Sequence, residues 1–180
     1  MAESGCLRDM KVQNLEVGGT LSGIRRPVIA LTNAATVAKT LVASDSGSLV
    51  TIDPSTDSET TVTLTLPSPE VGLEFTFAII ADAGNAGADV ILKTTGNAVD
   101  LKGLLTQGNA ANDVSVDATD VAAGETLLEL AHSKITFDAS VSTSFGNTIF
   151  TCVCNGSHWI TTGNSTAVSG VTNPVLSANV

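Results

Sequence analysis

The amino-acid sequence predicts an all-β protein whose body is a single β-sandwich or jelly-roll-like domain. Thr and Val are abundant and only 14% of the 180 residues are charged, a composition that favours strands and tight turns over long helices. Short apolar and alternating runs recur about every 8–12 residues between clusters of Gly, Pro, Asn and Ser. Because Tyr is absent and Phe and Trp number only five and one, we expect an aliphatic core built from Val, Leu, Ile and Ala.

Three parts of the chain differ in amino-acid composition and in their pattern of apolar residues. Residues 1–35 are interpreted as an extended N-terminal arm, because KVQNLEVGGTLSGIRRP (11–27) is short, interrupted by Gly and ends at a proline; a short strand at 11–17 is left open. Residues 36–163 carry the strand signals and form the predicted sandwich. Residues 164–180 are uncharged and are interpreted as a C-terminal tail.

The body opens with two short elements. The run TVAKTLVA (36–43) fits a strand and, less well, a short helix. The turn DSGS (45–48) follows, and SLVTID (48–53) is the second predicted strand.

The clearest alternation comes next, in TTVTLTLP (60–67). Val62, Leu64 and Leu66 share one face of this predicted strand, while threonines occupy the other face. Pro67 ends the strand because proline has no N–H to donate to a neighbouring strand. The following run LEFTFAIIAD (73–82) becomes continuously apolar, which indicates a central strand covered on both faces.

The remaining body repeats the pattern. AGNAGA (83–88) is read as a turn that brings ADVILKTTG (88–96) back as the pairing partner of 73–82. The segment 124–132 favours a strand, with a short helix as the alternative. Further strands are predicted at 97–105, 113–116, 133–139 and 147–154, and a hairpin leads into a short final strand within 155–163.

The charge of the chain is strongly asymmetric. Residues 1–40 hold five basic and three acidic side chains, whereas residues 41–180 hold 3 basic and 15 acidic ones. An acidic body repels nucleic acid and anionic membranes, so we expect neither as a partner. The arm cations Arg8, Lys11, Arg25 and Arg26 are therefore the candidate contacts to an acidic partner surface; the alternative is that they only aid solubility.

The cysteines indicate a reducing assembly environment. Three cysteines leave at least one thiol without an intrachain partner. Cys152 and Cys154 share one face of a predicted strand, where such neighbours are poorly placed to bridge each other, so we expect buried, reduced thiols. The segment MAESGCLRDM (1–10) is too polar for a secretory leader, and no apolar run approaches the length of a membrane span.

Candidate chemistry is sparse. No nucleophile elbow, zinc-protease or phosphate-loop motif is present. Cys152, Cys154 and His158 offer three metal ligands without an evident fourth. The loop carboxylates Asp113, Asp117 and Asp120 leave Ca²⁺ binding open, with a solvated acidic loop as the alternative. We therefore predict no enzyme activity, no catalytic residue and no cofactor.

Trp159 is the largest apolar side chain and follows a Cys-Asn-Gly turn. One face of its ring suits the edge of a sandwich core while its N–H reaches solvent or a carbonyl oxygen. The alternative is an anchor at an interface with another chain. The core position is the preferred interpretation.

Two segments, in this order, resemble small β-rich virion proteins of tailed bacteriophages, marine ones especially. TLPSPEVGLEFTF (65–77) follows the pattern TLP-x-P-x-x-G-L-x-F-x-F, and CNGSHWITTG (154–163) follows C-[DN]-G-x-x-W-x-x-x-G. The similarity covers about residues 45–163, and Ile160 stands where Tyr is more usual. The arm and the tail lie outside it.

The resemblance implies a capsid decoration (cement) protein. Such a protein binds the outer surface of the phage head, bridges neighbouring major capsid proteins and forms homo-oligomers, often trimers. It would assemble in the bacterial host cytoplasm and reside in the virion. The alternatives are a tail, fibre or knob component of the virion and a carbohydrate-binding host-attachment module; no internal repeat supports a long fibre.

Overall fold

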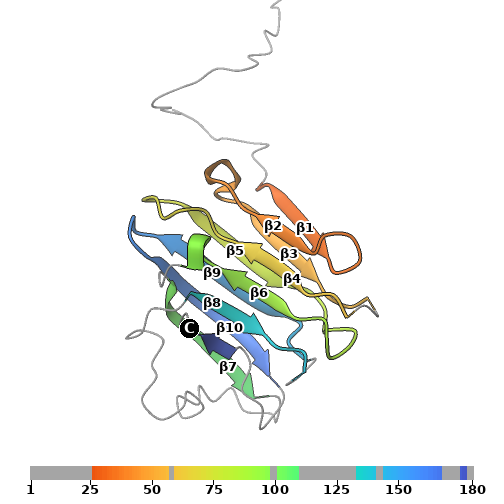
Figure 1. The fold of residues 1–180 in the computed structure, drawn as a ribbon. Coiled ribbons are helices and arrows are strands. Elements are labelled where there is room, and N and C mark those ends of the chain that lie inside the picture. Colours follow the sequence, from red (N-terminus) through yellow and green to blue (C-terminus); the bar gives the residue numbers. More distant parts are fainter. Residues whose placement is uncertain are drawn as a thin grey trace, which may run out of the picture.

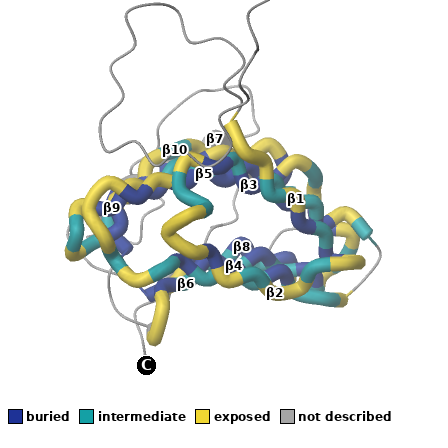
Figure 2. The backbone as a smooth tube through the Cα atoms, turned by 90° about the horizontal axis from the view of Figure 1, so that it is seen from above, coloured by how far each residue is buried: buried dark blue, intermediate teal, exposed yellow. Residues whose placement is uncertain are grey.

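A computed structural model describes residues 26–56, 59–97, 101–109, 133–140, 144–167 and 175–177. These residues form two β-sheets that face each other in two layers (Figures 1 and 2). The protein is therefore β-rich, as predicted. The expected elements at 11–17, 113–116 and 124–132 lie outside the described residues.

Sheet A has six strands in the order β1-β3-β5-β9-β10-β7. Their bounds are Val28–Thr32 (β1), Leu49–Asp53 (β3), Glu74–Ile79 (β5), Thr148–Cys154 (β9), Trp159–Ala167 (β10) and Leu101–Asn109 (β7).

Sheet B has five strands in the order β11-β8-β6-β4-β2. Their bounds are Val175–Ser177 (β11), Lys134–Phe137 (β8), Val90–Lys93 (β6), Val62–Thr65 (β4) and Ala38–Thr40 (β2).

The first six strands alternate between the two sheets. In sheet A, β1, β3 and β5 run parallel to one another, and in sheet B, β2, β4 and β6 do the same. Each crossover that a parallel pair requires is thus supplied by a strand of the opposite sheet. In a jelly roll, neighbouring strands run antiparallel, so these parallel pairs depart from the predicted topology.

The later strands add antiparallel pairs to both sheets. β9 lies antiparallel to β5 in sheet A, and β8 lies antiparallel to β6 in sheet B. The predicted hairpin into the last part of the body is confirmed, because β9 and β10 pair antiparallel with Cys154 opposite Trp159. β10 is longer than the short final strand that the sequence predicts, since it continues to Ala167.

The predicted pairing of 73–82 with 88–96 is wrong. β5 pairs with β3 and β9 in sheet A, whereas β6 pairs with β4 and β8 in sheet B. The connection between β5 and β6 crosses from one layer to the other. It packs against the earlier connection between β3 and β4. A Cβ on Gly84 would lie 2.3 Å from the Thr56 carbonyl oxygen, a close approach that only glycine permits.

Alternation correctly identifies the buried faces. Val62, Leu64 and Leu66 are fully buried, as predicted for the strand at 60–67. Phe77, Ala78 and Ile79 are buried in succession in β5, which lies in the middle of sheet A. The prediction of a central strand is confirmed, but cover on both faces is not: Ile80, at the end of the apolar run, is 54% exposed.

The core is not only aliphatic. All six aromatic residues of the chain are buried between the sheets. They form one continuous row in which neighbouring ring centroids lie 5.0–6.4 Å apart, in the order Trp159, Phe75, Phe77, Phe150, Phe137 and Phe145. The few aromatic residues are thus concentrated where they contribute most to packing.

The boundaries of the predicted arm and tail also differ from the sheet edges. The interval 28–32, placed in the arm from sequence, is strand β1 and pairs with β3. Residues 175–177, placed in the tail, are strand β11 and pair with β8. Helical structure in the described residues is limited to short 3₁₀ turns, at Ala43–Asp45 and Thr95–Asn97. Within these residues, no helix has the length and apolarity to cross a membrane.

Candidate functional site

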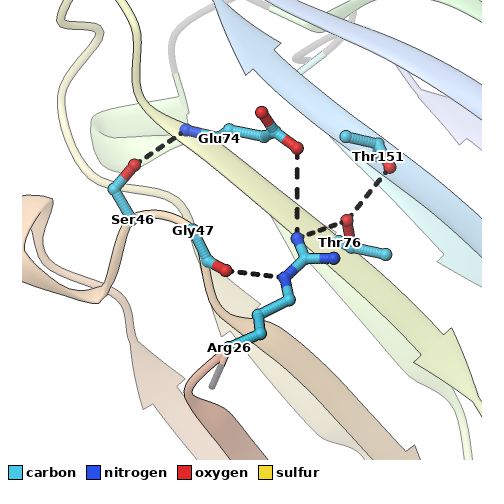
Figure 3. A network of polar contacts seen from close by, with 6 residues as sticks. All are labelled: Arg26, Ser46, Gly47, Glu74, Thr76 and Thr151. Carbon is cyan, nitrogen blue, oxygen red and sulfur yellow. Dashed lines mark hydrogen bonds and ion pairs between the residues drawn. The ribbon is translucent and has the colours of Figure 1, made fainter. Parts of the chain in front are cut away.

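Of the four candidate partner-binding cations, Arg26 is the one that the structure describes; Arg8, Lys11 and Arg25 lie outside the described residues. Arg26 precedes β1 and reaches across to the turn before β3 and to β5 (Figure 3). Its Nε donates to the Gly47 carbonyl oxygen at 2.6 Å and its Nη2 donates to Thr76 Oγ1 at 2.7 Å. Glu74 Oε1 lies 4.0 Å from Nη2.

These contacts extend over the outer surface of sheet A. The Glu74 N–H donates to Ser46 Oγ at 3.0 Å, and Thr76 Oγ1 lies 3.1 Å from Thr151 Oγ1 on β9. The guanidinium group therefore ties the start of β1 to the neighbouring strands through planar, directional hydrogen bonds. The role of Arg26 as a contact to a partner stays a prediction, and its side chain retains 42% exposure.

The two body cysteines are buried and free of disulfide bonds. Cys152 Sγ lies 3.3 Å from Thr161 Oγ1, and Cys154 Sγ accepts a hydrogen bond from the Gly156 N–H at 3.4 Å. Burial raises the pKa of the Cys152 thiol from 9.0 to about 12, because the thiolate loses its hydration. A thiol in this state is a poor nucleophile and a poor metal ligand at neutral pH.

The other predicted metal groups do not assemble in the part of the chain that is described. No group of three or more His, Cys, Asp or Glu side chains converges there on a common point. His158 is half-buried at the β9–β10 turn, where its backbone N–H donates to Asn155 Oδ1 at 2.8 Å. The acidic triad Asp113, Asp117 and Asp120 lies outside the described residues.

Trp159 belongs to the core. Its side chain is fully buried, and its ring centroid lies 5.7 Å from that of Phe75. The expected hydrogen bond of the indole N–H is missing, since Nε1 is buried with no partner among the described residues. Full burial removes this side chain from any outer surface, so it is not an exposed anchor for another chain.

The two segments that carry the virion-protein resemblance meet at one corner of the body. The Gly72 N–H donates to the Cys154 carbonyl oxygen at 3.0 Å, and the Cys154 N–H donates to the Leu73 carbonyl oxygen at 2.8 Å. A Cβ on Gly156 would lie 2.7 Å from Val71 Cγ2. The glycines of both segments are thus placed where the two chain reversals approach each other.

The outer face of sheet A is a surface that the sequence did not reveal. Thr76, Thr151 and Thr162 form one cross-strand row on β5, β9 and β10. Among the residues that the structure describes, eight large apolar side chains are exposed, and four of them lie on the strands of this face, namely Val28, Ile149, Val153 and Ile160. Period-2 alternation marks these side chains as facing away from the core, but it cannot show which strands lie side by side.

Compared with protein-family models, curated proteins and solved structures, the chain gives no significant match.

Proposed function

We propose that this chain is a non-enzymatic virion structural protein of a tailed bacteriophage, namely a capsid decoration (cement) protein. In this proposal, the protein binds the outer surface of the phage head as a homo-oligomer, with a trimer favoured. It bridges neighbouring copies of the major capsid protein and stabilises the shell. The facing sheets form its sandwich body, and the arm supplies the contact to the head.

The observation that carries this proposal is the corner formed by the two resembling segments. Residues 65–77 and 154–163 are far apart in the sequence, yet Gly72 and Leu73 hydrogen-bond to Cys154 there. At the same corner, Trp159 packs against Phe75 and the backbone at Gly156 approaches Val71. In this chain, the two short patterns that carry the likeness are thus parts of a single packed corner, and this supports reading them together.

The surface of the body also suits adhesion. The outer face of sheet A carries a Thr row and several exposed β-branched apolar side chains. Such side chains stand on a pleated sheet and lose little conformational freedom on contact. A stiff face of this kind suits a protein whose role is attachment to a regular lattice.

A carbohydrate-binding module is not favoured. Sugars are commonly seated on exposed aromatic rings, and every aromatic residue of this chain is buried in the core. The tail, fibre or knob component remains the second candidate within the same virion. Copy number separates the two, because a decoration protein covers the whole head and a tail component is present in few copies.

The test is binding to purified expanded phage heads. Full-length protein, a chain that begins at residue 26, and the variant R8Q/K11Q/R25Q are each titrated against heads, and bound copies are counted. The shorter chain preserves Arg26 and β1, so the body keeps its edge strand. The triple variant preserves the backbone of the arm and removes three of its charges.

Saturable binding of the full-length protein at hundreds of copies per head, lost in the shorter chain, is expected. Weakened binding of R8Q/K11Q/R25Q would assign the contact to charge, whereas unchanged binding would assign it to the arm backbone or its apolar side chains. Absence of the protein from heads, together with its presence in tail fractions only, would overturn the decoration role.

A further inference from the structure

Two lysines stand side by side on the outer face of sheet B. Lys93 ends β6 and Lys134 begins β8, and these residues face each other in the antiparallel register of the two strands. Lys134 is exposed and Lys93 is half-buried. Thr65 on β4 extends the same row on the other side of Lys93.

This placement is unfavourable for the isolated chain. Like charges directly opposite each other in a sheet are destabilising. In the described part of the chain, no carboxylate lies within 4.0 Å of either ammonium group. By contrast, Arg26 and Lys39 each have a carboxylate at 4.0 Å, from Glu74 and Asp45 respectively. The lysine pair therefore offers two positive charges that the described body does not neutralise.

The opposite end of the sheets is acidic. Five carboxylates gather where β3, β5 and β8 end and where β4 and β6 begin: Asp53, Glu59, Asp82, Asp89 and Asp138. We call this set the acidic end. Connections at this end are joined by hydrogen bonds, as the Ala139 N–H donates to Asp89 Oδ1 at 2.8 Å and the Gly146 N–H donates to Asp82 Oδ1 at 2.8 Å.

The lysine pair and the acidic end lie at opposite ends of the strands. Val90, next to Asp89, begins β6 and is paired with Phe137, next to Asp138, whereas Lys93 and Lys134 are paired at the far end of the same two strands. In Figure 1 the arrows of β6 and β8 point in opposite directions along sheet B, as this antiparallel register requires. Each molecule thus carries the lysine pair at one end of the strands, where Asp45, Glu70 and Glu74 also lie, and the five carboxylates of the acidic end at the other.

We propose that the Lys93–Lys134 pair is a docking site for the acidic end of a second copy of this chain. The contact is head-to-tail, so the two surfaces that meet are different. Such contacts form a closed ring when the rotation between copies closes. The lysine pair and the acidic end would be the two surfaces through which copies of the homo-oligomer proposed above meet. This inference therefore rests on the proposed function.

Salt dependence follows from the charges. The net charge of each copy is −10, so whole molecules repel one another at long range. At about 0.15 M ionic strength, interactions beyond about 8 Å are screened while close pairs still attract; at 1 M the screening length falls to about 3 Å. Association is therefore expected near physiological salt and is weakened at 1 M.

Sedimentation velocity of the full chain provides the test. The wild type, K93E/K134E, E59K/D82N and the control K102E are compared over a range of protein concentrations. Asn at 82 keeps an oxygen that accepts the Gly146 N–H. Lys102 lies in sheet A opposite Ile160, at the same end of the strands as the lysine pair but in the other layer, so its reversal changes charge at this end without altering the pair.

The wild type and K102E are expected to associate, whereas both double variants raise the apparent dissociation constant at least about tenfold. A wild type that remains an 18.2 kDa monomer throughout, or a K93E/K134E variant that associates as tightly as the wild type, would overturn the proposal. If K93E/K134E does not fold, K93Q/K134Q removes the charges without reversing them, and the same comparison applies. Head binding is measured separately, so a monomer that binds heads would overturn this contact and leave the decoration role standing.

Discussion

Trp159 packs against Phe75 with their ring centroids 5.7 Å apart and their planes inclined by 44°. Trp159 begins β10 and Phe75 lies in β5, so this contact joins the two segments that carry the virion-protein resemblance. It is also one end of the aromatic row that runs through the core. The corner is therefore a place where a single substitution should affect the whole fold.

Replacement of Trp159 by Ala is expected to lower the free energy of unfolding by about 3–5 kcal/mol, because it leaves a large cavity in a packed core. W159F should cost less, since it retains a ring and removes an indole N–H that has no partner among the described residues. Urea denaturation followed by far-UV circular dichroism measures both changes. The exposed neighbour offers a control, I160T, which should change stability by no more than about 0.5 kcal/mol. Equal stability of W159A and I160T would contradict the assignment of Trp159 to the core.

Replacement of Gly163 by Ala is expected to disrupt the pairing of β9 and β10. A Cβ at this position would lie 2.4 Å from the Ile149 carbonyl oxygen and 2.4 Å from Phe150 Cα, and backbone atoms cannot move aside as a flexible side chain can. We expect a loss of roughly 3 kcal/mol or more in unfolding free energy. The matched control is Gly47→Ala, where φ is +83° and no atom lies within 4 Å of the added Cβ. That change should cost only about 1–2 kcal/mol of backbone strain. A thermal or urea unfolding curve of G163A that overlays that of G47A would contradict the close approach.

The Arg26 contacts predict different effects for its partners. R26A removes two short hydrogen bonds from the guanidinium group and should lower the unfolding free energy by about 1–2 kcal/mol. E74Q removes only an ion pair at 4.0 Å between groups that are 42% and 51% exposed, so its effect should stay below about 0.5 kcal/mol. R26K cannot reproduce the planar fork and should resemble R26A. Urea denaturation distinguishes the three variants. A larger loss in E74Q than in R26A would show that charge, rather than hydrogen bonding, holds this residue.

The buried Cys152 thiol predicts a loss of stability at alkaline pH. Its pKa is about 12 in the folded chain against 9.0 as the ordinary value, so the unfolded state binds fewer protons between these two pH values. Stability from this group is fully present below pH 9 and falls above it, by about 1.4 kcal/mol for each pH unit.

The measurement is the unfolding free energy of the wild type and of C152A from pH 8 to pH 11. The advantage of the wild type should shrink as the pH rises, because only the wild type carries the titrating thiol. Parallel stability curves for the two proteins would contradict a buried, neutral Cys152.

Local patterns predicted much of the strand content correctly. The alternation of Val62, Leu64 and Leu66 marks a buried face because successive side chains of a strand point in opposite directions. The turn at 155–158 predicts the β9–β10 hairpin because antiparallel strands can be joined by a short connection. These signals depend on residues close together in the sequence, and the structure confirms them.

Pairing between distant strands was not accessible in the same way. The run 88–96 has the pattern of a strand, but nothing in its alternation indicates whether it continues the sheet of β5 or crosses to the opposite layer. The close approach of Gly84 to the backbone of Thr56 occurs where the β5–β6 connection crosses between the layers. It depends on the position of the β3–β4 connection, which is distant in the sequence. The aromatic row likewise depends on strands that are far apart in the chain.

The amino-acid sequence alone determined the β class, the buried faces of several strands, the hairpin at Trp159 and the scarcity of reactive groups, because composition and short-range periodicity carry that information. Tertiary structure decided the parallel winding between two sheets, the corner where residues 65–77 meet residues 154–163, and the cross-strand position of Lys93 beside Lys134. A period of two residues in the sequence indicates which face of the sheet a side chain occupies. It does not indicate which strands lie on either side of it. Those neighbours are chosen by the packing of the whole chain, where long-range hydrogen bonds and core contacts are satisfied together.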